Sequence, residues 1–382
     1  MELQFIYDIL SQQRESNDKV VEEKGFRISL TTNYSCNYSC DYCYQVSTKH
    51  MTDRIEPIDI QNINVFYDQL CEHYGLENRF HSVGIMGGEA LLPKNSAIME
   101  NVFLNWADAK FIITTNGVHI EYYKSLLANH NIELRISLDG DEETHYQHRK
   151  PQNKSFYRKT LEGVNWAVNK GIPISIMTVF NPDNITRYMS FFTILESLGW
   201  RTKPNIDLYF IAQKDGACDD INPDYLYRSM SAIQELKRMD ERAHFARFTG
   251  IVPGIATLIS SLKKPTESLL GYRCTALNNY GNYVFDPSGK VYICNVVPND
   301  EFVVGTFRPN VDINYNRINY YKNRTVKKME KCIECNVKNF CRGGCTISAY
   351  LNEGNPLSPS CGFWKDQKVL DFYDQTLSSN YI

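Results

Sequence analysis

From Phe26 to about Phe210, short apolar runs alternate with longer amphipathic stretches. Each apolar run is rich in β-branched residues and ends in polar or turn-forming residues, which is typical of a buried parallel strand. The six runs are FRISLTT, HSVGIMGG, KFIITTNG, ELRISLDG, PISIMTVF and NIDLYFIA. Segments between them, such as 58–74, 157–169 and 184–198, space their apolar residues at the helical period. The pattern predicts an α/β fold built from right-handed βαβ units around a parallel sheet.

The number of strands limits the kind of barrel that this region can form. A complete eight-unit barrel takes about 250 residues, whereas this region has fewer than 200 residues and six predicted strands. We therefore expect a partial (βα)6 TIM-like barrel. A helical connector is predicted over about 223–248, and VFDPSGKVYI predicts a hairpin with its turn at 286–289. The expected parts are an N-terminal extension over 1–23, the barrel over 24–215, the connector over 216–269, and a cysteine-rich domain with a C-terminal helix over 270–382.

Composition narrows the possible partners. Apolar residues make up 43% and charged residues 22% of the chain, as in ordinary globular proteins. A net charge of −3 provides no basic field for nucleic acid, so we exclude nucleic acid as a primary partner. The N-terminal sequence lacks the features of a secretory signal, and no stretch has the roughly 18–20 apolar residues of a membrane helix. We expect a cytoplasmic, non-membrane protein, in which the 12 cysteines bind metal or do chemistry rather than form disulfides.

The first cysteine cluster directly follows the first predicted strand. Cys36, Cys40 and Cys43 have the spacing C-x-x-x-C-x-x-C. Loops at the carboxyl ends of parallel strands are where active sites form. Three thiolates on one loop can hold three irons of a four-iron cluster and leave the fourth open, as a catalytic centre requires. The alternatives are a partial zinc site completed elsewhere and cysteines packed as small apolar side chains.

This spacing, with the aromatic Tyr42 before the last cysteine, resembles the signature of the radical S-adenosylmethionine (SAM) superfamily. The resemblance implies that Cys36, Cys40 and Cys43 ligate a 4Fe-4S cluster, whose open iron binds SAM through its amino and carboxylate groups. It also implies that one electron cleaves SAM to methionine and a 5′-deoxyadenosyl radical, which removes hydrogen from an unactivated carbon.

Later strand ends carry further motifs of this family. Met86-Gly87-Gly88-Glu89 matches its GGE motif, which binds the SAM amino group, and Ser137-Leu138-Asp139-Gly140 with the later Arg149 resembles its contacts to the SAM ribose and carboxylate. Thr115 and Asn116 lie at the end of the third predicted strand and are expected to face the same open end of the barrel. Taken singly, these residues equally suit a strand-end turn, a capping serine and a surface arginine. The resemblance implies a SAM-contacting set of Tyr42, Met86, Gly87, Gly88, Glu89, Asn116, Ser137 and Arg149.

A second cluster places seven cysteines between Cys274 and Cys361. Closely spaced cysteine pairs suggest zinc first. Their complete order, however, resembles the SPASM domain of radical SAM proteins, which holds auxiliary 4Fe-4S clusters. The resemblance assigns Cys274, Cys294 and Cys345 to the nearer auxiliary cluster, and Cys332, Cys335, Cys341 and Cys361 to the outer one.

The expected cofactors are therefore SAM and three 4Fe-4S clusters, one catalytic and two auxiliary. The nearer auxiliary cluster has only three cysteines, so its fourth iron is open or is filled by Glu267, Ser268, Tyr272 or water. Cys71 and Cys218 fit neither pattern and are expected to be structural. None of the eight histidines has a ligand-like spacing.

Two peptide-modifying groups of this family compete for the function. Sulfatase maturases, which form formylglycine, carry an aspartate base after the second SPASM cysteine, where this chain has Asn295, and an amide cannot accept the proton. We therefore favour a maturase that cross-links a ribosomally made precursor peptide through a carbon–carbon bond, as in a cyclophane, or through a thioether. A non-catalytic iron–sulfur or zinc scaffold is the alternative of another class. An external electron donor such as flavodoxin or ferredoxin is implied, and no catalytic residue is assigned.

Overall fold

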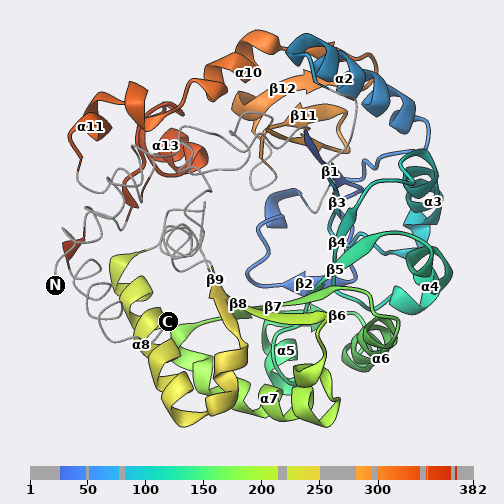
Figure 1. Ribbon diagram of the computed structural model, residues 1–382, viewed down its shortest axis with the longest axis vertical. Coiled ribbons are helices and arrows are strands. Elements are labelled where there is room, and N and C mark those ends of the chain that lie inside the picture. The colour runs from blue at the N-terminus through green and yellow to red at the C-terminus, as the bar shows by residue number, and fades with distance from the viewer. Residues whose placement is uncertain are drawn as a thin grey trace.

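One sheet of 11 strands organises the part of the chain that the structure describes (Figure 1). This computed structural model describes residues 26–48, 51–76, 82–213, 222–249, 281–294, 299–335, 341, 343–362 and 366–367. The strands follow the order β13-β12-β11-β10-β1-β3-β4-β5-β7-β8-β9. Figure 1 shows the strands of the barrel curving around a central space, with helices outside them.

The six predicted strands are neighbouring parallel strands within this sheet. They are β1 (Arg27–Thr31), β3 (Ser82–Met86), β4 (Phe111–Thr115), β5 (Ile132–Ser137), β7 (Ile174–Phe180) and β8 (Ile206–Ala212). The helices between them are α2 (Asp59–Tyr74), α3 (Ser96–Asn105), α4 (Ile120–Ala128), α5 (Glu142–His148), α6 (Phe156–Asn169) and α7 (Tyr188–Ser197). The predicted six-unit partial barrel is confirmed.

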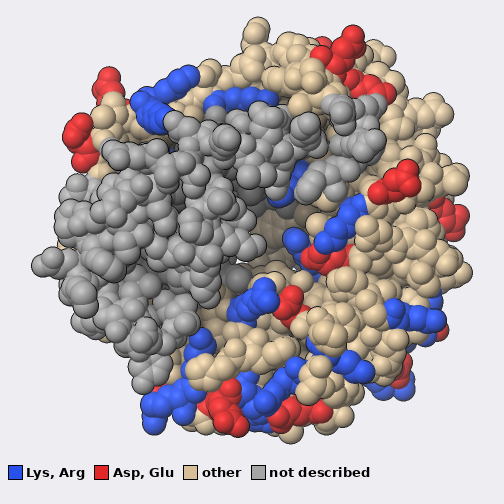
Figure 2. Space-filling model, in the orientation of Figure 1, with Lys and Arg blue, Asp and Glu red and all other residues tan. Residues whose placement is uncertain are grey.

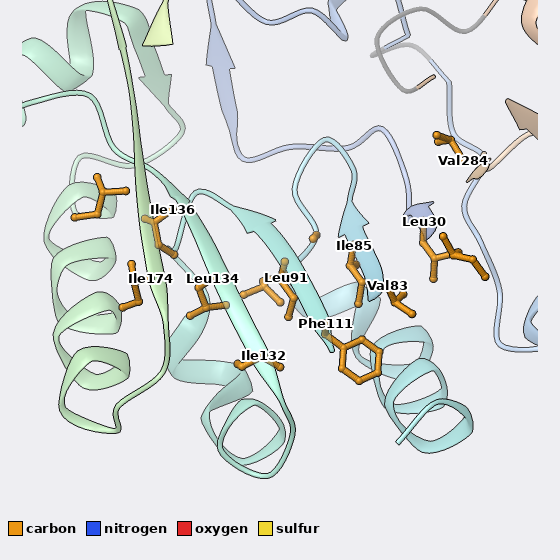
Figure 3. Close-up of a cluster of buried hydrophobic side chains, with 14 of the residues drawn as sticks. Leu30, Val83, Ile85, Leu91, Phe111, Ile132, Leu134, Ile136, Ile174 and Val284 are labelled. Carbon is orange, nitrogen blue, oxygen red and sulfur yellow. The ribbon is translucent and has the colours of Figure 1, made fainter. Parts of the chain in front are cut away.

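The barrel core lies between the strands and the outer helices (Figure 3). Along β7 and β8, buried and partly exposed residues alternate, as the period of two in a strand requires. Ile85, Leu134 and Ile136, which Figure 3 labels, are almost completely buried. Burying each such side chain contributes about 1.5–3 kcal/mol. This packing makes the barrel a rigid support for the loops at the strand ends.

The connector contains more than the predicted helix. Its helix α8 is Pro223–Met239, and the Asn222 side chain caps it by accepting from the N–H of Asp224 at 2.8 Å. The chain then forms β9 (Arg247–Thr249), which pairs parallel with β8. The purely helical expectation over 223–248 is therefore wrong at its C-terminal end, because this polar strand is too short to show a periodic pattern.

The predicted hairpin is confirmed and extends the same sheet. It consists of β10 (Asn282–Phe285) and β11 (Lys290–Tyr292), which are antiparallel, and β12 (Val303–Thr306) and β13 (Asp312–Ile313) follow. Gly289 closes the turn with a φ of +85°, and its N–H donates to the carbonyl oxygen of Asp286 at 2.9 Å. β10 also pairs parallel with β1, so the C-terminal region continues the barrel sheet.

Short helices lie in the C-terminal region, among them α10 (Tyr315–Lys322), α11 (Glu330–Ile333) and α13 (Thr346–Glu353). Cys332 lies in α11, and Cys345 directly precedes α13. Two further strands, β2 (Tyr38–Cys40) and β6 (Arg149–Pro151), form a small separate sheet. The predicted extension over 1–23 and the C-terminal helix lie outside the described residues, and the domain limits stay predictions. No helix among the described residues is long and apolar enough to cross a membrane.

Candidate active site

The loop after β1 carries Cys36, Cys40 and Cys43, whose side chains are all partly exposed. Asn33 shapes the start of this loop, because its Oδ1 accepts from a backbone N–H two residues later at 2.7 Å. The Nδ2 of Asn33 donates to Asn95 Oδ1, in the segment after β3, at 3.0 Å. These bonds hold the cysteine loop over the carboxyl ends of the strands, which we call the mouth of the barrel.

The small sheet fixes the middle of the cysteine loop. β2 pairs with β6 so that Cys40 stands opposite Arg149. The Nη1 of Arg149 lies 3.9 Å from Cys40 Sγ, within the range of a hydrogen bond to sulfur. A guanidinium at this place favours the thiolate of Cys40, which is the form that binds iron. Neither strand was predicted, because three polar residues give no strand pattern.

A buried ion pair lies beneath the loop. Asp139 is fully buried, and its carboxylate accepts from Arg149 Nε at 2.7 Å, from the Val179 N–H at 2.8 Å and from the hydroxyl of Tyr42. Burial opposes ionisation of Asp139, but the charge of Arg149 and the hydrogen bonds from Arg149 and Tyr42 together hold the pKa of Asp139 below its usual value. The guanidinium also lies 5.3 Å from the ring centroid of Tyr42. The pair thus anchors the loop next to both Cys40 and Cys43.

His145 extends this network, although the sequence analysis gave no histidine a role. Its Nδ1 accepts from the N–H of Asp139 at 3.1 Å, and its Nε2 lies 3.4 Å from the hydroxyl of Tyr38 in the loop. Burial, followed by the charge of Arg149, lowers the pKa of His145 to about 3, so the ring is neutral. Local spacing could not reveal this residue, because its partner in the loop is 107 positions away.

Glu89 joins the ends of two strands. Its carboxylate is buried and accepts from the Thr115 hydroxyl at 2.5 Å, the Leu91 N–H at 2.8 Å and the Asn116 N–H at 2.7 Å. Burial raises the pKa of Glu89, while these donors oppose the shift. An ionised carboxylate offers about four acceptor positions. The chain occupies three of them, which leaves one for an ammonium group at the mouth.

The glycines before Glu89 allow close contact between β3 and the cysteine loop. A Cβ at Gly88 would lie 2.4 Å from the carbonyl oxygen of Ser35, and one at Gly87 would lie 2.7 Å from that of Asn33. The N–H of Gly88 donates to Asn33 at 2.7 Å. The two glycines therefore permit a close approach of the backbone of the segment after β3 to the backbone of the cysteine loop.

The other predicted SAM-contacting residues lie at the same edge. Met86, Asn116 and Ser137 end or follow β3, β4 and β5, whose carboxyl ends meet at the mouth. Asn116 Nδ2 donates to Asn37 Oδ1 in the cysteine loop at 2.6 Å. The fold therefore gathers the predicted set around the loop, while its contacts to SAM stay a prediction.

The C-terminal cysteines are partly described. Cys332, Cys341 and Cys345 are buried, and Cys294, Cys335 and Cys361 are partly exposed. Cys274 lies outside the described residues, as do Cys218, Asn295 and the suggested extra ligands Glu267, Ser268 and Tyr272. Cys71 is buried in the barrel core on α2, as expected for a structural cysteine.

Arg324 is a buried cation among these cysteines that sequence reasoning missed. Its guanidinium donates to four backbone carbonyl oxygens in segments 343–344 and 356–358, at 2.7 to 2.9 Å. These segments lead into Cys345 and Cys361. Arg324 therefore fixes the spacing of two predicted ligand loops, and its positive charge suits a region where thiolates gather.

The donor set at the mouth fits an iron–sulfur cluster. Thiolates are the ligands of such clusters, and the loop provides Cys36, Cys40 and Cys43 beside the Arg149 cation. Burial, followed by the charge of Glu89, raises the pKa of Cys36 to about 12, so the free thiol is protonated and metal binding must displace that proton. Within the described ranges, no three Cys, His, Asp or Glu side chains lie close enough to hold one metal ion.

The molecular surface is hollowed at the centre of its described face. Figure 2, in the orientation of Figure 1, shows lysine or arginine and aspartate or glutamate side chains around this hollow. Charges of both signs suit a ligand that carries both an ammonium and a carboxylate.

Comparisons with known proteins agree with this fold. Residues 15–191 match the sequence model of the radical SAM superfamily, and no curated protein sequence matches the chain. The structure is similar to that of anSMEcpe with bound AdoMet, at 17% identity and a TM-score of 0.66, over 93% of this chain and 97% of that one. It is also similar to Streptococcus suis SuiB bound to S-adenosylmethionine, at 15% identity and a TM-score of 0.59, over 93% of this chain and 77% of that one. The barrel region with its cysteine loop is therefore similar in sequence to the radical SAM superfamily of enzymes, and the described chain shares the fold of these two solved structures.

Proposed function

We propose that this chain is a radical SAM maturase that forms an intramolecular cross-link, through a carbon–carbon or thioether bond, in a ribosomally made peptide. The observation that carries the proposal is the loop of Cys36, Cys40 and Cys43, held at the barrel mouth beside Glu89 and Arg149. A similar structure is described as anSMEcpe with bound AdoMet and Cp18Cys peptide, at 16% identity and a TM-score of 0.66. That likeness supports a peptide as the substrate.

Each loop residue has a defined part in this proposal. Cys36, Cys40 and Cys43 hold a 4Fe-4S cluster, which supplies, when bound, the electron that cleaves SAM to methionine and a 5′-deoxyadenosyl radical. Arg149 favours the thiolate of Cys40, and Asp139 keeps Arg149 in place. The chain thereby orients the cysteines before any cofactor arrives.

The strand ends hold SAM against the loop. Glu89 offers its fourth acceptor position to the SAM ammonium, and the remaining N–H groups of Arg149 face the SAM carboxylate. Ser137 and Asn116 contact the ribose, while Met86 and Tyr42 line the site. Gly87 and Gly88 bring the backbone of β3 against the loop.

Two auxiliary 4Fe-4S clusters complete the proposed cofactors, on the cysteine assignments given above. The buried cation of Arg324 beside Cys345 and Cys361 supports a site of high negative charge in this region. We further propose a flavodoxin or ferredoxin as the electron donor. A cytoplasmic location suits the ten cysteines proposed as cluster ligands, because they must stay reduced until they bind iron.

The test of this function uses anaerobically reconstituted enzyme with dithionite. Replacing Cys36, Cys40 and Cys43 by alanine is expected to abolish 5′-deoxyadenosine formation, because no open iron is left. Cys71→Ser is the matched control, since Cys71 is a core cysteine far from the mouth, and it is expected to keep the activity. SAM cleavage by the triple variant would refute the assignment of the catalytic cluster.

The reaction itself is tested by mass spectrometry of a short peptide encoded beside this gene and co-expressed with the enzyme. A cross-link requires a loss of two hydrogen atoms. Formylglycine in a sulfatase-type peptide would instead support the second candidate, which Asn295 disfavours because an amide is not a base. Bound iron without any SAM cleavage would support a non-catalytic scaffold.

A further inference from the structure

Asn37 occupies an unusual place in the cysteine loop. It follows Cys36 directly, and only 5% of its surface is exposed. Its Oδ1 accepts a hydrogen bond from Asn116 Nδ2 at 2.6 Å. Asn116 in turn uses its Oδ1 to accept from the N–H of Val118 at 3.1 Å. Asn37 thus links the first loop cysteine to the end of β4.

These bonds determine which way both amides point. A backbone N–H can only donate, so the atom of Asn116 that faces Val118 must be the oxygen. The Nδ2 of Asn116 therefore faces Asn37, and the Asn37 atom that meets it must also be an oxygen. Turning either amide over would place two donors against each other. These hydrogen bonds therefore determine which end atom of the Asn37 amide is Nδ2.

That Nδ2 group is buried and has no hydrogen-bond partner in the described part of the chain. Buried amide donors in proteins are almost always paired, so an unpaired one indicates an absent acceptor. The Oδ1 of the same amide lies 3.9 Å from Cys36 Sγ. The two end atoms of an amide are about 2.2 Å apart, so Nδ2 lies at most about 6 Å from that sulfur. The unpaired donor therefore lies close to the first cysteine of the loop.

We propose that Asn37 Nδ2 donates a hydrogen bond to a sulfur atom of the cluster on Cys36, Cys40 and Cys43, and thereby raises its reduction potential. This inference rests on the proposed function, because it requires that cluster. Hydrogen bonds to the sulfurs are one of the terms that set such potentials. Reduction adds one negative charge to the cluster, so a donor stabilises the reduced form more than the oxidised form. Asn116 is then a positioning residue that aims the Asn37 amide.

The test compares the cluster's reduction potential in native enzyme and in Asn37→Asp, by spectroscopic titration at pH 9 without SAM. Aspartate has the shape of asparagine and keeps the acceptor for Asn116, but an ionised carboxylate has no donor. The ratio of reduced to oxidised cluster at a fixed potential is expected to fall about tenfold, which corresponds to 59 mV for a one-electron couple. The loop cluster is recognised among the clusters as the one whose spectrum changes when SAM is added.

Two further variants make the result decisive. Ser39→Asp adds the same charge to the same loop at an exposed position, and it is expected to keep the native potential because solvent screens it. Asn37→Leu removes the donor without adding charge. If Asn37→Asp fails to bind iron, the reduction potential of Asn37→Leu is compared with that of the native enzyme instead. Asn37→Leu is also expected to lower the potential.

A native reduction potential in an iron-loaded Asn37 variant would overturn the inference. If such a variant also bound SAM more weakly, Asn37 Nδ2 would donate to SAM and not to the cluster. Native enzyme that has no SAM-responsive cluster would instead refute the proposed function. The two failures are therefore distinguishable.

Discussion

Replacing Asp139 by asparagine tests how far the buried ion pair supports the cysteine loop. The carboxylate of Asp139 is fully buried and is the acceptor for Arg149 Nε, the Val179 N–H and the Tyr42 hydroxyl. An amide keeps one acceptor atom and turns two N–H groups toward these donors. It also leaves Arg149, which is 7% exposed, without its counter-charge.

The expected loss of stability is about 3–5 kcal/mol, the usual cost of removing one partner of a buried pair. At roughly 2–4 °C per kcal/mol for a domain of this size, the melting temperature should fall on the order of 10 °C. The loop should also lose iron, because Arg149 lies beside Cys40 and Tyr42 precedes Cys43. Calorimetry and iron content after anaerobic reconstitution measure the two effects.

The matched control is Asp183→Asn, which removes the same charge from an exposed pair. Asp183 and Arg228 have side chains that are 71% and 53% exposed, and such surface pairs contribute little to stability because solvent screens their charges. The control should therefore melt close to the native protein. Equal melting temperatures and iron contents for the two variants would show that the buried pair does not hold the loop.

The pH dependence gives an independent check. The pKa of Asp139 is lowered in the folded protein, because burial, which raises it, is opposed by the charge of Arg149 together with the hydrogen bonds from Arg149 and Tyr42. Its stabilisation is therefore present above the unfolded pKa of about 4 and is lost as the pH falls through the folded pKa. The difference between native protein and Asp139→Asn should be full at pH 7 and should shrink below about pH 4. A difference that stays constant into that range would contradict the role of ionised Asp139.

Three further predictions concern other parts of the site. Glu89→Gln should weaken SAM binding by about 1–3 kcal/mol, measured by equilibrium dialysis, because an amide cannot accept from all the donors around it. A native affinity for SAM would exclude the proposed ammonium contact. Arg324→Gln should lower the free energy of unfolding by about 3 kcal/mol, because the backbone carbonyl groups that Arg324 pairs with lose their donors, and it should lower the iron content of the auxiliary clusters. Arg317→Gln, at a half-exposed site, should keep the iron. Tyr34→Phe removes the hydroxyl that donates to Asp286 and should cost about 1–2 kcal/mol in urea denaturation, a loss that an unchanged midpoint would rule out.

The sequence by itself determined the elements whose evidence is local. Runs of β-branched residues predicted six parallel strands, because each run must bury both faces. The spacing of Cys36, Cys40 and Cys43 placed three thiols on one loop, since residues that close along the chain cannot separate far in space. The position of that loop after a strand then indicated the mouth of the barrel.

Only the tertiary structure decided which distant residues become partners. Asp139 with Arg149, Glu89 with the end of β4, and Asn37 with Asn116 each depend on strand order and register. The pairing of β10 with β1 is of the same kind, because it joins residues more than 250 positions apart. A hydrogen bond forms only where two backbone segments bring donor and acceptor to about 3 Å. Local patterns along the chain do not predict that distance, because it depends on how distant segments pack.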